Sequence, residues 1–551
     1  MESDMDQHQI PLWWQTGVIY QIYPRSFMDS TGNGVGDLMG IIQKLDYLSD
    51  TLGVDAIWLS PFYPSPMADF GYDVADYVNV HPMFGTLEEF DELLMGSHQR
   101  GLKVIIDLVP NHSSDQHAWF LESRASRKNP KRDWYIWADP KTDGSTPNNW
   151  LSVFGGSAWE WDENTEQYYL HSFLKEQPDL NWRNPEVKVA IFKVVQFWLD
   201  RGVDGFRIDV AHFILKDPNM RDNPLNSQVQ KSFHKPFGEY DSQIHLYDKA
   251  HPDVHRVYRE LRSLIDSHNG EQPGVIIGEI HIFDLPVWAQ YYGENLDEIH
   301  LPFNFSLLNT DWRAQAVRDA VDKLEDVLQP GAWPNYVLGN HDESRLASRV
   351  GESGARLAAM LLLTLRGTPT LYYGDEIGMT DVEIPKEYQQ DPWGIRVPGL
   401  SRDPCRTPMQ WSERPNAGFS PGSGPELWLP LADNYPVTNV ENLIQDPTSI
   451  LTLYRQLLKY RHDHPVLQVG DYVPVSGISD NCFVYLREDE MVDDPSRTLI
   501  ALNFSTHEHQ LDLSQINVSG DLLISTMLDR CGRTELNNLI LRPQEGVIIE
   551  I

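Results

Sequence analysis

The sequence predicts an α/β fold in which parallel strands close into a barrel, and three observations support this prediction. Eight short runs rich in β-branched and aromatic residues follow one another along the chain. Helical patterns with start and stop signals lie between several of them. Eight alternating units are the number that closes a (β/α)8 TIM barrel. We expect that barrel to carry a small inserted domain after the third strand and a C-terminal antiparallel β domain.

The eight predicted strands are residues 18–23, 56–59, 104–107, 205–209, 275–279, 299–303, 336–339 and 370–373. One helix is predicted over 184–201, opened by Asn-Pro and ended by glycine, and another over 37–53. An open doubly wound sheet is the alternative. Its usual phosphate-binding loop is absent, because Gly32-Asn33-Gly34-Val35-Gly36 matches neither GxGxxG nor a loop ending in GK[ST].

Two stretches depart from the alternation of strands and helices. Residues 111–182 are rich in Trp, Asn, Asp and Gly and are too long for a simple loop, so we expect a small inserted domain. After a helix at about 449–462, alternating patterns at 482–486 and 498–502 predict an antiparallel β domain. The expected domains are a barrel built from 1–110 and 183–462, the insertion at 111–182, and a C-terminal β-sandwich at 463–551.

Composition and charge narrow the possible partners. The chain has 551 residues, of which 41% are hydrophobic, and this is enough for a large core. Its 80 acidic and 44 basic residues give a formal charge of −36, which repels nucleic acid and anionic membranes. A small neutral substrate suits this field. The oligomeric state stays open.

Signals for export or membrane insertion are missing from the sequence. Residues 1–6 lack the basic start and the apolar run of a secretory signal. The longest apolar stretch, 358–365, falls far short of the ~20 residues that span a bilayer. Cys405, Cys482 and Cys531 are an odd, widely spaced set, which argues against disulfides and a zinc site. We therefore expect a cytoplasmic protein.

Acidic residues stand at the ends of several predicted strands. Asp107 ends the third strand, Asp209 the fourth and Glu279 the fifth, while Asp342 follows the seventh. The active site of a barrel lies at the C-terminal ends of its strands. Because close carboxylates raise one another's pKa, their clustering favours a functional explanation over a structural one.

Arg207 lies two residues before Asp209, so both side chains are expected to point into the barrel. The guanidinium is expected to keep Asp209 ionised, beside a Glu279 of raised pKa. Retaining glycosidases need this pairing, because one carboxylate attacks the anomeric carbon while the other protonates the leaving oxygen. A buried ion pair that only holds the barrel together is the alternative for Arg207.

Five stretches carry a family resemblance. They are Asp107-Leu108-Val109-Pro110-Asn111-His112, Gln177-Pro178-Asp179-Leu180-Asn181, Gly205-Phe206-Arg207-Ile208-Asp209, Gly278-Glu279-Ile280 and Gly339-Asn340-His341-Asp342. With them the chain resembles the α-amylase superfamily of glycoside hydrolases, and in particular its oligo-1,6-glucosidase and α-glucosidase branch. The resemblance runs from about Trp13 to the end. It implies that Asp209 is the nucleophile, Glu279 the acid/base and Asp342 a third carboxylate that holds the reacting glucose.

The resemblance also implies which residues surround the reacting sugar. It assigns His112 and His341 to hydroxyl contacts, and it adds Phe173 to the residues that contact the substrate. Tyr72 lies in a stretch, Asp69-Phe70-Gly71-Tyr72-Asp73, that resembles the family's second-strand loop, and its ring would stack under the sugar. A satisfied core histidine is the alternative for each of the two histidines.

The resemblance also implies which residues set the specificity. In exo-acting members, Asp69 pairs with an arginine of the long eighth-strand loop and grips the non-reducing end of the substrate. Arg402 and Arg406 are both candidates for that arginine here. Val210, directly after the nucleophile, goes with cleavage of α-1,6 links in this branch, whereas core packing is the alternative explanation.

One loop has the spacing of a calcium site. Asp29, Thr31, Asn33, the carbonyl of Val35 and Asp37 stand at every second position, which can wrap oxygen ligands around Ca2+. Related enzymes bind calcium there with more acidic ligands. A plain glycine-rich turn is the alternative. We expect the chemistry itself to need no cofactor.

Together these observations predict a retaining, exo-acting α-glucosidase that releases α-glucose from the non-reducing end of short α-linked oligosaccharides and accepts α-1,6 links. An α-1,4-glucosidase, a transglucosylase and an isomerase of sucrose or trehalose remain alternatives on the same scaffold. A different class is a catalytically inactive relative that serves as the ancillary subunit of an amino-acid transporter. That alternative requires a membrane helix and damaged carboxylates, and the sequence shows neither.

Overall fold

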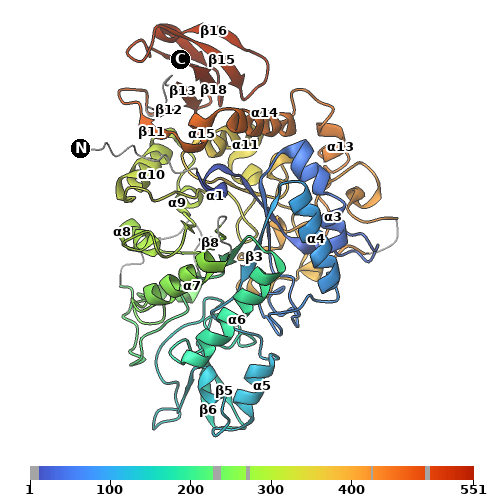
Figure 1. Ribbon diagram of the computed structural model, residues 1–551, viewed down its shortest axis with the longest axis vertical. Coiled ribbons are helices and arrows are strands. Elements are labelled where there is room, and N and C mark those ends of the chain that lie inside the picture. The colour runs from blue at the N-terminus through green and yellow to red at the C-terminus, as the bar shows by residue number, and fades with distance from the viewer. Residues whose placement is uncertain (1–10, 228–236, 269–272, 423–425, 490–496) are drawn as a thin grey trace, which may run out of the picture.

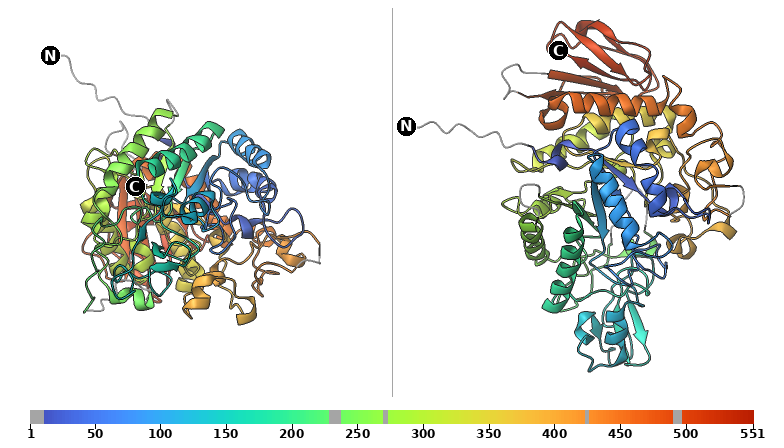
Figure 2. Two further views of the ribbon diagram at one scale, coloured as in Figure 1. Left: turned by 90° about the horizontal axis from the view of Figure 1, so that it is seen from below. Right: turned by 45° about the vertical axis from the view of Figure 1, so that its right-hand side comes forward.

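The computed structural model describes residues 11–227, 237–268, 273–422, 426–489 and 497–551. Along its long axis, Figure 1 shows the C-terminal sheet at the top, the barrel in the middle and the segment with α5 (Ala118–Ala125), β5 (Trp159–Asp162) and β6 (Gln167–Leu170) at the bottom. The right-hand view of Figure 2 shows the same arrangement from a second side. Residues 1–6, on which the prediction about export rests, lie outside the described part.

Seven parallel strands form the wall of the barrel, in the order β10-β1-β2-β3-β7-β8-β9. They are β1 (Ile19–Ile22), β2 (Ala56–Leu59), β3 (Lys103–Leu108), β7 (Gly205–Ile208), β8 (Val275–Gly278), β9 (Leu301–Pro302) and β10 (Thr370–Tyr372). Two isolated parallel bridges, Asn304 with Tyr336 and Val337 with Thr370, connect β9 to β10. The predicted barrel is confirmed.

The seventh strand differs from the sequence-based prediction. A regular strand was expected at 336–339, but only Tyr336 and Val337 pair with neighbours. Pro334 precedes this segment and offers no N–H, while Gly339 follows it where the chain turns toward the carboxylates. Between the proline and the glycine, pairing is limited to Tyr336 and Val337.

Helices surround the strands. The longer ones are α4 (Leu87–Gln99), α6 (Pro185–Arg201), α7 (Val254–His268), α10 (Ala314–Val327) and α11 (Leu346–Thr364), and the shorter ones are α1 (Trp13–Thr16), α2 (Pro24–Phe27), α3 (Leu38–Ile42), α8 (Leu285–Ala289), α9 (Ser306–Asn309), α12 (Pro392–Arg396) and α13 (Val440–Leu443). The helix predicted over 184–201 is confirmed as α6. Asn184 caps its first turn and Gly202, at φ 104°, closes it. The helix predicted over 37–53 is divided into α3 and a π-helical segment, Tyr47–Leu52.

Between β3 and α6 the chain forms a small separate layer. It contains α5 and the antiparallel sheet β4-β6-β5, in which β4 is Trp137–Ala138. Aromatic rings fill its centre, and Phe120 lies parallel to Trp137 at a centroid distance of 5.7 Å. The bridge between His112 and Asp179 joins the two ends of this segment at the mouth of the barrel.

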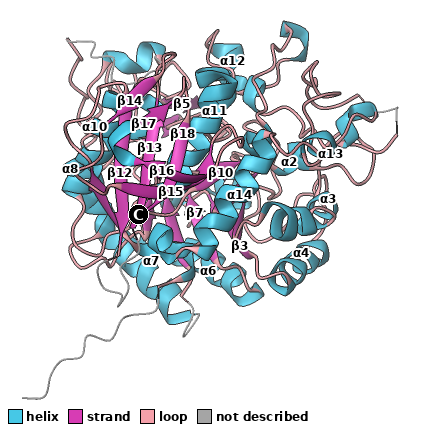
Figure 3. Ribbon diagram, turned by 90° about the horizontal axis from the view of Figure 1, so that it is seen from above, coloured by secondary structure: helices cyan, strands magenta, loops and turns pink. Residues whose placement is uncertain are grey.

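The C-terminal part begins with α14 (Ile450–Asp463) and α15 (Pro465–Val469) and continues as a six-stranded sheet. Its strands are β11 (Asp471–Pro474), β12 (Cys482–Glu488), β13 (Arg497–Asn503), β18 (Gly546–Glu550), β15 (Ser519–Ser525) and β16 (Gly532–Glu535), and β14 (His509–Leu511) pairs with β17 (Leu539–Leu541). Figure 3, which looks down from above, shows this sheet in front of the barrel. In the described ranges, no helix is both long enough and apolar enough to cross a membrane.

Candidate active site

The strand ends open into a cavity of about 120 Å³ on the side of the barrel nearest the inserted segment. Of the residues that the sequence predicts for the site, those that line it are Asp69, Tyr72, His112, Phe173, Asp209, Val210, Glu279, Asp342 and Arg402. Arg207, His341 and Arg406 do not line the cavity but contact residues that do. Residues far apart in the sequence thus meet at one depression.

Arg207 joins three of the carboxylates. Its Nη1 lies 2.7 Å from Oδ1 of Asp107 and 2.9 Å from Oδ1 of Asp209, and its Nη2 lies 2.7 Å from Oε2 of Glu279. All four side chains are buried. One guanidinium therefore balances three acidic groups, and this excess of negative charge destabilises the site unless a proton is retained there.

The pKa values of the pair do not follow the order that the sequence led us to expect. Burial raises the pKa of Asp209 well above its ordinary value, although Arg207 opposes this. Burial also acts to raise the pKa of Glu279, but Arg207 and the hydrogen bond from His281 outweigh it and lower that pKa. The expectation was wrong because Arg207 is shared and lies as close to Glu279 as to Asp107.

The two oxygens of Glu279 have different surroundings. Oε2 accepts from Arg207 Nη2 at 2.7 Å and from the backbone N–H of Val210 at 2.9 Å. Oε1 lies 2.9 Å from Nε2 of His281. The sequence-based prediction missed His281, although its position two residues after Glu279 is a signal that it stands on the same side of the chain.

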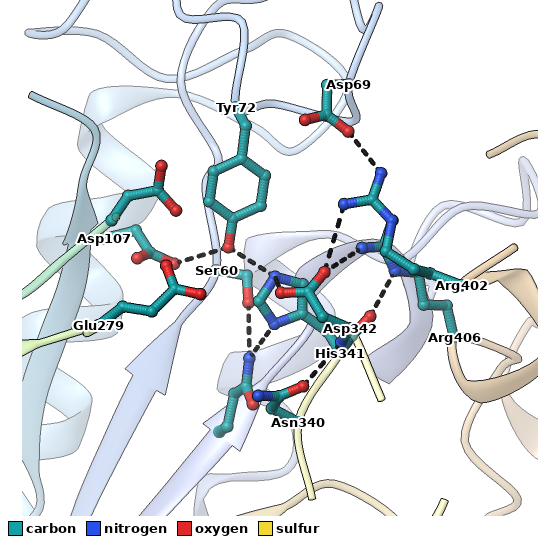
Figure 4. A network of polar contacts seen from close by, with 12 residues as sticks. Ser60, Asp69, Tyr72, Asp107, Glu279, Asn340, His341, Asp342, Arg402 and Arg406 are labelled. Atoms are coloured by element: carbon teal, nitrogen blue, oxygen red, sulfur yellow. Dashed lines mark hydrogen bonds and ion pairs between the residues drawn. The ribbon is translucent and has the colours of Figure 1, made fainter. Parts of the chain in front are cut away.

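Asp342 lies at the other side of the cavity, as Figure 4 shows. Its Oδ1 is 2.8 Å from Nη2 of Arg406 and 3.3 Å from Nη1 of Arg402, and its Oδ2 is 3.3 Å from Nε2 of His341. Burial acts to raise the pKa of Asp342, but His341 and the two arginines outweigh it and hold the pKa well below the usual range. Asp342 is therefore a firmly ionised carboxylate with a fixed orientation.

Arg402 also closes one end of the cavity. Its Nη2 donates to Oδ1 of Asp69 at 2.7 Å and lies 2.7 Å from Oδ1 of Asp391 (Figure 4 shows the contact with Asp69). Arg406 instead contacts Asp342 and the carbonyl of His341. Of the two arginines left open by the sequence, Arg402 is the one that reaches Asp69.

The family described as "Alpha amylase, catalytic domain" matches residues 21–470 of the chain. The chain belongs to the α-amylase family of glycoside hydrolases.

Several α-amylase family relatives are similar over most of their length. A probable α-glucosidase of Rhizobium meliloti (strain 1021) is 44% identical over 86% of this chain and 85% of its own. An oligo-1,6-glucosidase of Parageobacillus thermoglucosidasius is 38% identical over 98% and 99%.

Among solved structures, the α-glucosyl transfer enzyme XgtA is 43% identical, with a TM-score of 0.90 over 98% of this chain and 100% of its own. A mutant of the trehalulose synthase MutB, in complex with Tris, is 34% identical, with a TM-score of 0.88 over the same shares. The likeness therefore spans hydrolases, a transfer enzyme and a synthase.

The two histidines predicted to contact the sugar lie in different places relative to the cavity. His112 lines the cavity, and its Nε2 is 3.1 Å from Nε2 of Gln177 and 3.2 Å from the carbonyl of Tyr72. His341 is 1% exposed, and both of its ring nitrogens have partners, Gln21 at 2.8 Å and the hydroxyl of Tyr72 at 2.7 Å. Its ring lies parallel to that of Tyr72, at 5.5 Å and 5°. His341 therefore holds Tyr72 from behind the cavity.

Val210 has an unusual backbone conformation. Its φ is 37°, which is rare for a β-branched residue and marks local strain. Two hydrogen bonds to Glu279 hold this conformation. The N–H of Val210 donates to Glu279 Oε2, and the N–H of Ala211 donates to the Glu279 carbonyl, both at 2.9 Å. Its side chain is 8% exposed and packs in the apolar cluster that includes Phe173, Phe213 and other rings at the cavity.

Sequence reasoning missed several other residues of this α-amylase family site. Asp391 holds Arg402, but its position before Pro392 reads only as a helix cap, and it does cap α12. Gln177, quoted only as part of a branch motif, donates to Oδ2 of Asp69 at 3.2 Å. Further aromatic residues line the cavity: Phe154, Phe213, Phe237, Tyr240 and Trp393. Nothing in the spacing of these rings distinguishes them from core residues.

The loop predicted as a calcium site lies elsewhere, and its oxygens are engaged. Asp29 accepts hydrogen bonds on both carboxylate oxygens at 2.6–2.9 Å, one of them from the hydroxyl of Ser420. Asp37 accepts backbone N–H groups at 2.6 and 2.9 Å, and the side-chain oxygen of Asn33 accepts the N–H of Val35 at 2.8 Å. As arranged, these residues fit a glycine-rich turn better than a cation shell. In the described part of the chain, no three His, Cys, Asp or Glu residues are placed to hold a metal ion.

Whether this loop binds calcium can be tested by calorimetry. From the hydrogen bonds of Asp29 and Asp37 we expect chelated protein to show neither binding heat nor a higher melting temperature when Ca2+ is added. Mg2+ at the same ionic strength is the control. Saturable heat with Ca2+ alone, accompanied by a rise in melting temperature, would contradict the turn and support a site.

Proposed function

We propose that this glycoside hydrolase is a retaining, exo-acting α-glucosidase that removes α-glucose from the non-reducing end of short α-linked oligosaccharides. One observation carries the proposal: Asp209 and Glu279 face a single cavity whose end is closed by the Asp69–Arg402 ion pair. A pocket with a charged end accommodates a chain terminus and excludes a continuing chain. The arrangement therefore favours removal of one terminal sugar over cleavage within a polymer.

The proposed reaction has two displacements. A carboxylate oxygen of Asp209 forms a bond to the anomeric carbon while the bond to the leaving oxygen breaks, and Glu279 gives its proton to that oxygen. Water then attacks the anomeric carbon, its proton passes to Glu279, and the bond to Asp209 breaks. Asp342 accepts hydrogen bonds from hydroxyl groups of the same glucose. Every step uses side chains of the chain, so we propose that the chemistry needs no cofactor.

Substrate is proposed to decide which carboxylate of the pair carries the proton. In the free site, Arg207 and the carboxylates hold Asp209 and Glu279 as one coupled pair. Positive charge develops at the anomeric carbon beside Asp209 as the glycosidic bond breaks. The mechanism requires Asp209 to be ionised and Glu279 to carry the proton when the substrate reacts. We propose that a bound substrate favours this distribution, because the positive charge of the transition state develops beside Asp209.

Linkage preference is proposed to depend on Val210. The parent is expected to prefer isomaltose to maltose, because an apolar wall suits the methylene of a 1,6-linked acceptor. Val210→Thr keeps the shape and adds a hydroxyl for a 1,4-linked ring, so the ratio of kcat/KM should move toward maltose by roughly 1–2 kcal/mol. The measurement is kcat/KM for both sugars with both proteins.

Val153→Thr is the matched control for this change, because Val153 lines the same cavity and is 9% exposed. Its ratio should stay at the parent value. An unchanged ratio in Val210→Thr would leave Val210 as a packing residue. The strained φ of 37° is not the variable, because threonine is β-branched as well.

A transglucosylase or an isomerase is the second candidate, favoured by the 43% identity to the α-glucosyl transfer enzyme XgtA. Transfer differs from hydrolysis in whether a sugar or a water molecule accepts glucose from Asp209. Incubation with concentrated maltose, isomaltose, sucrose and trehalose, followed by product analysis, separates the candidates. Free glucose in stoichiometric yield supports hydrolysis, and new disaccharides or trisaccharides support transfer.

The remaining expectations about the protein's surroundings stay proposals. We propose a small neutral oligosaccharide as its partner, since the charge of −36 disfavours nucleic acid and anionic membranes. A cytoplasmic location stays a prediction. The cysteines Cys405, Cys482 and Cys531 are free in the structure.

A further inference from the structure

His281 stands where the cavity meets the acid/base. It lies two residues past Glu279, in the segment that follows β8, and its side chain is 33% exposed whereas that of Glu279 is 7% exposed. Its ring stacks flat on Phe305, with a centroid distance of 4.4 Å and an angle of 5°. The stack fixes the plane of the imidazole, and Nε2 then lies 2.9 Å from Glu279 Oε1.

The hydrogen bonds of Glu279 decide which of its oxygens can carry a proton. Oε2 receives two donors, Arg207 Nη2 at 2.7 Å and the N–H of Val210 at 2.9 Å. A carboxylate oxygen has two lone pairs in its plane, and both are occupied here. A proton on Oε2 would meet two N–H groups, so the proton that reaches the substrate must sit on Oε1. His281 faces that oxygen.

We propose that His281 is a positioning residue of the reaction, which orients Oε1 of Glu279 toward the leaving oxygen. The inference rests on the proposed role of Glu279 as the acid/base. Nε2–H of His281 donates to one lone pair of the ionised Oε1, and the other lone pair is left toward the cavity. In the first displacement the Oε1–H bond breaks and the proton passes to the leaving oxygen. In the second, water returns a proton to Oε1, so His281 is not consumed.

Other charged groups around Glu279 set the background for this effect. Arg207 and Asp209 face it from β7 and its end, Asp342 faces it across the cavity, and the buried ring of His212 lies 6.2 Å from that of His281. Burial and the nearby charge of Lys249 lower the pKa of His212. Among these groups, the hydrogen bond from His281 favours the ionised form of Glu279. Removing it should therefore raise the pKa of Glu279.

The test compares leaving groups in His281→Ala. On maltose and isomaltose, whose sugar leaving groups need the proton, kcat/KM should fall about 10- to 100-fold, because a misplaced acid transfers its proton poorly. On 4-nitrophenyl α-glucoside, whose leaving group needs little protonation, the loss should stay below about threefold. The basic limb of the pH profile should move to higher pH, since a raised pKa keeps Glu279 protonated longer.

Two further variants separate positioning from packing. His281→Gln restores a side-chain N–H donor without the imidazole and should recover most of the activity on maltose and the parent pH limb. Phe305→Leu removes the aromatic ring on which His281 stacks. It should show the same difference between leaving groups, with a smaller loss of kcat/KM. Both remain informative if His281→Ala does not fold.

Controls make the outcomes decisive. His255→Ala removes a similar histidine–carboxylate contact outside the cavity, in which Nδ1 of His255 lies 2.8 Å from Oε2 of Glu298. This variant should keep the parent activity on both substrates. Equal losses on both substrates with an unmoved pH limb, or no loss on either, would overturn the positioning role of His281. Glu279→Gln must itself show the contrast between leaving groups. If it does not, the assignment of Glu279 has failed rather than that of His281.

Discussion

Asp209→Asn is expected to lower kcat on every α-glucoside by about four orders of magnitude or more, the scale at which removal of a nucleophile acts. The amide cannot form the ester that the proposed mechanism requires. The fold should persist, because the volume is nearly kept and Asn still accepts from Arg207 Nη1, now 2.9 Å from Oδ1 of Asp209. Removing one of three carboxylates around one guanidinium lowers repulsion, so the melting temperature should be unchanged or higher.

Steady-state kinetics and thermal melts of parent and variant test this prediction. Asp162→Asn is the matched control, because Asp162 is a buried partner of Arg124 at 2.6 Å in the inserted segment, outside the cavity. It should keep the parent kcat. Near-parental rates in Asp209→Asn would refute the assignment. Proton NMR of the first product from the parent gives an independent check, because initial β-glucose would contradict retention.

The second large effect is expected from Arg402→Lys. Arg402 donates from one guanidinium to Asp69, Asp342 and Asp391, and an ammonium group cannot reproduce that planar geometry. The grip on the terminal glucose should weaken in both ground and transition states, so kcat should fall and KM should rise. A loss of ~2–4 kcal/mol in kcat/KM is the scale of desolvated charged hydrogen bonds.

A double-mutant cycle with Asp69 shows whether the two residues act as a clamp. Asp69→Ala alone should cost a similar amount on maltose, and the double variant should cost less than the sum because both changes break the same 2.7 Å contact. Arg396→Lys is the control, since Arg396 is 38% exposed and lies 3.9 Å from Glu176. Parental activity of Asp69→Ala would remove Asp69 from the site.

Sequence reasoning was most successful where one residue acts through its position along the chain. Carboxylates at strand ends were placed on one rim because parallel strands in a barrel end on the same side. It failed where one group has several partners. The expectation that Arg207 keeps Asp209 ionised did not include Asp107 and Glu279, which reach the same guanidinium from β3 and from the end of β8. The spacing of residues along the chain does not show how many carboxylates share one guanidinium.

The sequence could not choose between Arg402 and Arg406 for a similar reason. They are four residues apart in one irregular loop, so alternation and helical periodicity say nothing about where either side chain points. The choice depends on Asp391, which binds Arg402 and turns it toward Asp69. Asp391 reads in the sequence as a helix cap. Its second use appears only when the loop is folded over the cavity.

The sequence by itself determined the barrel, the order of its strands and the carboxylates at their ends, because these follow from local patterns of hydrophobicity and from the direction of parallel strands. Only the tertiary structure decided how Glu279 is oriented, since its two oxygens are distinguished by Arg207 and Val210 on one side and His281 on the other. Those contacts join β7 to the end of β8 and to the segment after it. Hydrogen bonds between side chains depend on distances of tenths of an ångström across separate strands, and such distances are set by packing rather than by spacing along the chain.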